Sequence, residues 1–210
     1  MPRRGYDLPD ALPLFPLGGA VLLPRTRLPL NIFEPRYLQM VEDVLKTPER
    51  LIAVIQQLDD DGALATVGAA GRIVGFSEDE DGRYMIALGH VARFRLLSVD
   101  EGFSPYLTGR VKWSGQDEAP AAAADKDWDR TRFLSLLRRY MDGHELSTDW
   151  DAARDADAEL LVNSLAMALP FEAQEKQALL EARDACARRE LLEGLLEYEL
   201  RGGDSDEVLQ

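Results

Sequence analysis

The chain has 210 residues, of which 46% are hydrophobic and 30% charged, and its formal net charge is −14. A chain of this length is compatible with one or two domains and can bury a real core. Its acidic balance repels phosphate backbones, and no basic cluster with interleaved aromatic residues stands out, so we expect no nucleic-acid partner. The chain has no apolar run that would span a bilayer and no signal-peptide core, which argues against a membrane partner or export. Its single cysteine excludes an internal disulfide, and the cytoplasm is the expected compartment.

The first conspicuous stretch runs from Leu12 to Tyr37 and contains five prolines. Its apolar beginning, residues 12–17, is expected to form a strand only at a sheet edge. The reason is that Pro13 and Pro16 have no N–H group to donate to a neighbouring strand.

The same stretch continues with two more apolar pieces, at residues 21–23 and 28–33. The second has the form of a buried strand. Proline favours an extended backbone at the preceding Glu34 and suits the first position of a helix, so we expect a helix from Pro35 to about Lys46.

Strands are expected to dominate the following segment, up to residue 113. The apolar pattern predicts them at residues 51–58, 64–76, 84–88, 91–99 and 105–113. A break or bulge is expected near Gly68 and Gly71, and Asp81 and Gly82 suit a hairpin turn. Strands with one early helix and no βαβ rhythm favour a strongly bent antiparallel sheet or partial barrel.

A change of composition predicts a domain boundary. Residues 119–127 are polar and alanine-rich, which is typical of a linker between a domain at residues 1–118 and a helical subdomain at residues 128–210. Beyond the linker the apolar period becomes helical. Helices are expected at residues 128–141, 157–169, 172–180 and 184–201. They would pack as a small bundle, with their apolar faces on one another and on the β-rich domain.

Residues with catalytic or metal-binding chemistry are few. No lysine follows a glycine, so the chain has no P-loop. His144 opens a run that lacks the second histidine of a zincin helix, and the acidic hairpin has Leu88 where a calcium loop needs its glutamate. His90 and Cys186 are better explained as structural residues. We therefore expect no enzyme activity, no cofactor and no metal.

The order of these motifs resembles the amino-terminal substrate-binding domain of Lon proteases. The resemblance begins with LPLFPL at residues 12–17 and LPLNIFEPRY at residues 28–37, which a helix follows. It continues at residues 71–74, 81–83, 93–95, 169–170 and 175–180, and so spans about residues 12–200.

The resemblance implies an α+β fold. An N-terminal PUA-like antiparallel β pseudo-barrel with one helix would be followed by a C-terminal α-helical bundle. Complete Lon proteases also carry an ATPase and a serine-lysine peptidase, and we expect neither in this chain, which ends before either could begin.

The function that the resemblance implies is non-catalytic protein binding. The domain would capture exposed segments of unfolded or damaged proteins, or act as an adaptor in proteolysis together with a protease or chaperone. We expect an extended peptide to bind the proline-rich loop at residues 21–28 by apolar contact and by β-augmentation at nearby sheet edges. The candidate substrate-binding residues are Leu22, Leu23, Pro24, Arg25 and Phe33, although Phe33 also suits the core.

The remaining residues of the family motif are expected to be structural. They are Pro16, Glu34, Pro35, Arg36 and Tyr37. Arg36 could clamp a ligand carboxylate, but a hydrogen-bonded cluster with Glu34 that locks strand to helix is favoured. An alternative function is a small-molecule-binding protein or cryptic enzyme that uses the cleft between the two domains. A third is a structural partner whose apolar loop is buried in a homodimer, and homo-oligomerisation stays open.

Overall fold

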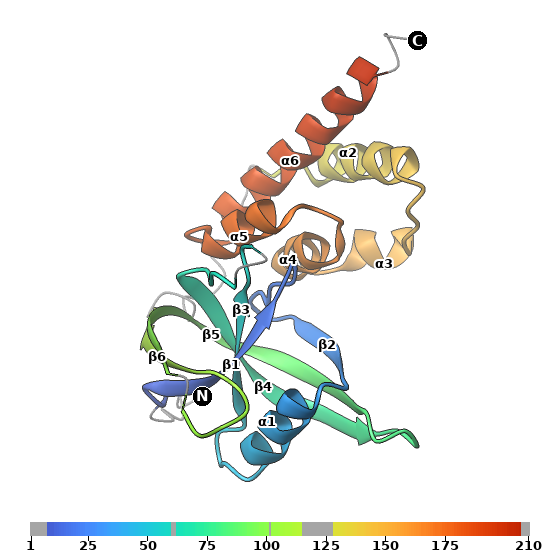
Figure 1. Cartoon of the computed structure of the whole chain (residues 1–210). Helices are drawn as coiled ribbons and strands as arrows, with labels where there is room; N and C mark the ends of the chain where they lie inside the picture. Colours follow the sequence, from blue (N-terminus) through green and yellow to red (C-terminus); the bar gives the residue numbers. More distant parts are fainter. Residues whose placement is uncertain (1–7, 60–61, 101, 115–127, 207–210) are drawn as a thin grey trace, which may run out of the picture.

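The structure is a computed structural model that describes residues 8–59, 62–100, 102–114 and 128–206. Strands and one helix form a barrel, and the remaining helices lie together above it in Figure 1. The expected α+β class is therefore confirmed. The predicted linker, residues 119–127, lies outside the described residues, and with it the exact boundary between the two predicted domains.

Six strands form one mixed sheet that closes on itself. They are β1 (Ala11–Leu17), β2 (Arg27–Ile32), β3 (Leu51–Gln56), β4 (Val67–Glu78), β5 (Tyr84–Asp100) and β6 (Thr108–Trp113). Their order is β2-β5-β4-β3-β1-β6, with a further pairing of β5 and β6. The long β5 closes the barrel because its first part pairs with β2 and its last part with β6. The pseudo-barrel is thus confirmed, with one parallel pair, β1 and β3, in an otherwise antiparallel sheet.

β1 is an inner strand of the sheet, and the prediction of an edge strand was wrong. Residues Ala11–Pro13 pair with β6, whereas Leu14–Leu17 pair with β3. The strand changes its neighbour at the middle, so each half has a ladder partner on one side only. This arrangement accommodates Pro13 and Pro16, because the missing N–H groups are tolerated where a strand has an open side.

β2 is the outer strand, and its prediction as a buried strand was also wrong. It pairs with β5 alone. Arg27, Pro29 and Asn31 are exposed, while Leu28 and Leu30 are half-buried. Only one face of the strand packs on the core, and Pro29 fits an outer strand because it has no N–H for a second partner.

Helix α1 (Pro35–Leu45) begins at the proline, as predicted, and packs its apolar face on the barrel. The hairpin between β4 and β5 turns at Gly82, whose φ of 75° lies in the left-handed region that favours glycine. The bulges of β4 were also predicted in part, and the register shifts at Ala70/Gly71 and again at Ile73/Gly75.

Five helices follow the barrel in the part of the chain that the structure describes. They are α2 (Arg130–Gly143), α3 (Trp150–Asp155), α4 (Ala158–Ala168), α5 (Ala173–Glu181) and α6 (Ala185–Asp206). Four of them were predicted to within a few residues, except that α6 extends to Asp206. The short α3 was missed. Its N-terminus is capped by the side chain of Asp149, which accepts hydrogen bonds from the backbone N–H groups of Asp151 and Ala152. Within the described ranges, no helix combines the length and apolar character needed to cross a membrane.

One apolar cluster runs without a break from the barrel into the helices. It joins Leu22 and Leu23, in the loop between β1 and β2, to Leu165 of α4, Leu179 of α5 and Leu192 of α6. Leu22 and Leu23 are 0% exposed. The prediction that they contact a bound peptide was therefore wrong, because the loop folds inward and the core already uses both side chains.

Buried polar side chains tie the same two parts together. The Nε2 atom of Gln56 donates to the carbonyl of Ala173 at 2.7 Å. Nη1 of Arg93 donates to the carbonyls of Leu180 and Ala182, each at 2.8 Å. Each bond joins a barrel strand to α5 or to the residue that follows it. The helices are therefore held on the barrel by directional bonds as well as by apolar packing.

The other half of the loop between β1 and β2 also faces the helices. The carbonyl of Pro24 accepts a hydrogen bond from Nδ2 of Asn163, on α4, at 2.8 Å. Arg25 pairs with Asp157 at 2.7 Å and with Glu159 at 3.1 Å. These contacts place Pro24 and Arg25 at the junction between the barrel and the helices.

Candidate functional site

Two adjoining hollows lie beside the end of β1 around Pro16, and the smaller of them lies in the seam where β1 and β2 are not paired with each other. One, of about 290 Å³, lies between the end of β1, the last residues of β2 and the start of α1. The other, of about 380 Å³, lies between β1 and the loops that follow β3 and β5. Both are lined by Pro16, Arg36, Tyr37 and Gln57. We call the two hollows together the barrel groove.

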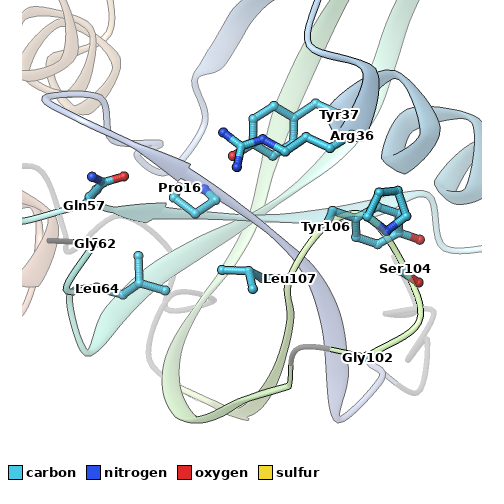
Figure 2. Close-up of a pocket in the computed structure, with 11 residues that line it drawn as sticks. Pro16, Arg36, Tyr37, Gln57, Gly62, Leu64, Gly102, Ser104, Tyr106 and Leu107 are labelled. Carbon is cyan, nitrogen blue, oxygen red and sulfur yellow. The ribbon is translucent and has the colours of Figure 1, made fainter. Parts of the chain in front are cut away.

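The family motif forms the centre of the barrel groove. Figure 2 shows Pro16 in the middle, with Arg36 and Tyr37 on one side and Leu64 and Leu107 on the other. The rings of Phe15 and Tyr37 meet edge to face, with centroids 4.5 Å apart, and this contact holds the start of α1 against β1. The sequence therefore folds its most motif-rich stretch into the wall of an open hollow.

The loop after β5 supplies the far wall. The hydroxyl of Tyr106 donates to Oδ2 of Asp43, on α1, at 3.1 Å. The carbonyl of Leu107 accepts the N–H of Leu14 at 2.8 Å, where β1 changes its neighbour. These two bonds fix the loop across the groove, so the larger hollow has an ordered wall in the described residues.

The strand edges along the seam differ in what they offer an extended peptide. β2 has no strand partner on its outer side, and Leu30, Asn31 and Ile32 line the smaller hollow. On the opposite wall, Pro16 has no N–H and provides only its carbonyl as a possible partner. Main-chain pairing by a peptide is therefore expected along β2, with apolar contact along β1.

The charged side chains of the groove form one close pair. Nε of Arg36 donates to Oε2 of Glu34 at 2.9 Å, and Nη2 contacts the same oxygen at 2.7 Å. The guanidinium carbon lies 4.5 Å from the centroid of the Tyr37 ring, in a cation-π contact.

The two tyrosines of the groove are both neutral. Burial raises the pKa of Tyr37, and the nearby Arg36 only partly opposes this. Burial likewise raises the pKa of Tyr106, with a smaller contribution from its bond to Asp43. Both phenols are therefore uncharged at neutral pH.

The Arg36–Glu34 pair is more exposed than the predicted structural cluster would be. The side chains are 53% and 43% exposed, and exposed ion pairs contribute roughly 0–1 kcal/mol to stability. We expect Arg36→Ala to lower the free energy of unfolding by less than about 1 kcal/mol, which is a melting shift below about 4 °C. Thermal unfolding followed by circular dichroism measures this. A loss near 3 kcal/mol would instead show that Arg36 has the structural role expected from the sequence.

The predicted site residues are divided among three places. Of the candidate substrate-binding residues, only Phe33 lies on the barrel groove, where it is 64% exposed. Leu22 and Leu23 belong to the core, and Pro24 and Arg25 to the junction with the helices.

The motif residues expected to be structural are mostly on the groove. Pro16, Glu34, Arg36 and Tyr37 line it, while Pro35 is the first residue of α1. Sequence reasoning missed Gln57, Leu64, Tyr106 and Leu107 altogether. They come from the loops after β3 and β5, which reach β1 through long-range pairing of β1 with β3 and β6, so no local pattern marks them. Among the described residues, no three His, Cys, Asp or Glu side chains are placed to hold a metal ion.

Comparison with known proteins identifies relatives over nearly the whole chain. Residues 11–197 match the family model of the ATP-dependent protease La (LON) substrate-binding domain. The chain is 28% identical to Lon protease 2 of Myxococcus xanthus over 202 residues, which are 90% of this chain and 24% of that protein. It is 27% identical to the Lon protease of Anaeromyxobacter dehalogenans, again over 90% of this chain and 23% of that protein. The chain thus spans about a quarter of the length of these relatives.

Solved structures show the same relationship. The Lon N-terminal domain protein from Xanthomonas campestris is 28% identical, with a TM-score of 0.58 over 87% of this chain and 96% of that chain. The N-terminal domain of the Mycobacterium avium complex Lon protease has a TM-score of 0.63 at 16% identity, over 89% and 98% of the two chains, and so shares the fold. The resemblance seen in the sequence is confirmed. The chain belongs to the family of LON substrate-binding domains.

Proposed function

We propose that this domain recognises protein substrates of Lon-type proteolysis by holding exposed, extended segments of unfolded or damaged chains in the barrel groove. It binds them without catalysing a reaction. The observation that carries the proposal is the open groove along an unpaired seam, lined by the motif that the family match includes. The cytoplasm is the compartment that we propose for this activity.

The groove offers the two contacts that an unfolded segment can make. Phe33 stands at its edge with most of its side chain in solvent, and large exposed apolar side chains are typical of interaction sites. β2 presents a strand edge beside it, to which an extended backbone can add whatever its sequence. Folded proteins have few free extended segments, so this combination selects for unfolded ones.

Delivery of the captured segment is part of the proposal. The match to full-length Lon proteases supports a partnership with a Lon-type protease, and an adaptor role with a protease or chaperone follows if the domain acts as a separate chain. Each segment would be held weakly, which suits a recognition step that must release its client again.

The two other hypotheses gain less from the structure. A small-molecule cleft between barrel and helices would lie where one apolar cluster and several buried hydrogen bonds now join the two parts. A homodimer built on the proline-rich loop would need side chains such as Leu22 and Leu23, which the chain buries within itself. Both stay hypotheses, and no observation on the groove favours them.

The test compares binding of unfolded and folded forms of one protein. Reduced ribonuclease A, alkylated with the neutral reagent iodoacetamide, serves as the unfolded ligand, and the native disulfide-bonded form serves as its match. We expect the domain to prefer the unfolded form, and Phe33→Ala to weaken binding about tenfold, as removal of a central aromatic anchor typically does. Tyr198→Ala is the matched control, because Tyr198 is a 70% exposed aromatic residue on α6 and not a lining residue of the groove.

Fluorescence anisotropy gives the affinities and thermal unfolding checks that both variants are folded. Equal binding of the two ribonuclease forms would overturn the proposal. So would equal losses in the two variants, because the groove would then have no special role.

A further inference from the structure

We infer that the segment bound in the barrel groove presents a carboxylate to Arg36 beside an apolar side chain that enters the larger hollow. This inference rests on the proposed function and specifies which segments the groove prefers. The carboxylate can belong to the C-terminus of the bound chain or to an aspartate or glutamate within it.

The charge of the larger hollow differs in sign from that of the chain. The protein has a formal net charge of −14, so most of its surface repels anions. Arg36 is nevertheless the single charged residue among the described residues that line the larger hollow. The other lining groups are apolar, backbone or neutral polar. An anionic group that enters this hollow therefore meets one cation and, among the described lining residues, no anion.

The guanidinium of Arg36 is held in position by its neighbours, and only some of its N–H donors make hydrogen bonds to them. Its Nε and Nη2 atoms contact a single oxygen of Glu34, and its plane lies near the Tyr37 ring. No described residue accepts a hydrogen bond from Nη1. A guanidinium has five N–H donors, so donors remain for a second carboxylate. Figure 2 shows this guanidinium beside Pro16, at the rim of the hollow.

The floor of the hollow suits an apolar side chain next to that carboxylate. Pro16, Leu64 and Leu107 line it from three segments of the chain, and Tyr106 closes one side. A volume of about 380 Å³ is enough for a leucine or phenylalanine side chain together with its backbone. The groove therefore combines one cationic contact with one apolar contact at a short spacing.

Glu34 sets the strength of the cationic contact. Its carboxylate already shares the guanidinium and repels any second carboxylate that approaches. A ligand amide or hydroxyl would not feel this repulsion. Removing the charge of Glu34 should therefore tighten binding of a carboxylate ligand and leave a neutral ligand unchanged, which a purely structural pair would not do.

Three labelled octapeptides test the inference by fluorescence anisotropy. The first ends in Ala-Leu-Phe with a free carboxylate, the second is its C-terminal amide, and the third is the amide with glutamate in place of that alanine. We expect the amide without glutamate to bind at least tenfold more weakly than the better of the two acidic peptides, as loss of a charged hydrogen bond predicts. Preference for the first or the third peptide identifies the source of the carboxylate.

Four variants locate the effect. Arg36→Gln is expected to abolish the preference for the acidic peptides, and Arg36→Lys to restore part of it, because lysine keeps the charge but loses the fork. Glu34→Gln should tighten binding of the acidic peptides about threefold or more. Arg132→Gln is the matched control, since Arg132 is an exposed arginine on α2 that pairs with Glu197. The Arg132→Gln variant is expected to prefer the acidic peptides as strongly as the wild-type domain does.

The outcomes separate this inference from the proposed function. If all three peptides bind equally and Phe33→Ala weakens each of them, the carboxylate inference is wrong while groove binding stands. If the acidic peptides are preferred and Arg36→Gln leaves that preference intact, the carboxylate binds elsewhere and the inference is again wrong. If no peptide binds and unfolded ribonuclease is not preferred, both proposals fail together.

Discussion

Replacing Leu23 by aspartate is expected to prevent the domain from folding at 37 °C. The side chain is 0% exposed and belongs to the cluster that joins the barrel to the helices. Truncation of a buried leucine to alanine costs about 2–5 kcal/mol, and an unpaired buried carboxylate adds several kcal/mol more. Domains of this kind have a total stability of about 5–15 kcal/mol. The loss from Leu23→Asp is therefore as large as the stability itself.

A graded pair of variants makes the result measurable. Leu23→Ala should remain folded and melt roughly 4–20 °C lower, given about 2–4 °C per kcal/mol for a domain of this size. Leu97→Asp is the matched control, because Leu97 is 62% exposed on β5 and should tolerate the charge at a cost below about 1 kcal/mol. A folded Leu23→Asp protein with a melting temperature near wild type would show that the loop leaves the core in solution.

The loop also shows where sequence reasoning stopped. Residues 21–23 and Phe33 are all apolar and lie in one proline-rich stretch, so their pattern does not distinguish core from surface. In the structure the side chain of Leu22 packs closely against β4. A Cβ atom added to Gly71, on β4, would lie only 2.7 Å from the Cδ2 atom of Leu22. Phe33 instead follows the last residue of an outer strand and points into solvent. Local periodicity predicts elements, but burial of a loop depends on which distant strand covers it.

Topology explains the other differences. Both prolines of β1 were correctly taken as a barrier to two-sided pairing, yet the strand is internal because it changes partner halfway. The groove has the same origin, since the loops after β3 and β5 reach β1 through its pairing with β3 in one half and with β6 in the other. Helices were predicted well because their apolar period is local. Long-range register is not encoded in any short window of sequence.

The junction between barrel and helices depends on a polar residue that no pattern marked. Asn163 lies on α4 and is 0% exposed. Its Nδ2 atom donates to the carbonyl of Pro24 at 2.8 Å, and its Oδ1 atom accepts from Nη1 of Arg188 at 3.0 Å. Arg188 is itself 1% exposed and donates from Nε to the carbonyl of Leu179. One amide thus connects the loop after β1 to α4 and α6.

Replacing Asn163 by alanine is expected to lower the free energy of unfolding by about 2–4 kcal/mol. The change removes both hydrogen bonds at once and leaves a buried carbonyl and one buried guanidinium donor without this partner. Each unsatisfied buried group costs about 1–3 kcal/mol, and a charged one more. Denaturant unfolding gives the free energy, and the melting temperature should fall by roughly 4–16 °C.

Two controls separate the buried hydrogen bonds from the general effect of losing an amide. Asn31→Ala removes an exposed asparagine from β2 and should change stability by less than about 0.5 kcal/mol. Asn163→Asp keeps an acceptor for Arg188 but loses the donor to Pro24. Its free energy of unfolding should therefore lie between that of the wild type and that of Asn163→Ala. If Asn163→Ala were as stable as Asn31→Ala, the two hydrogen bonds of Asn163 would contribute little to the junction between the barrel and the helices. A clear loss would instead show that the loop after β1, which the core and α4 both hold, keeps the helical part docked on the barrel.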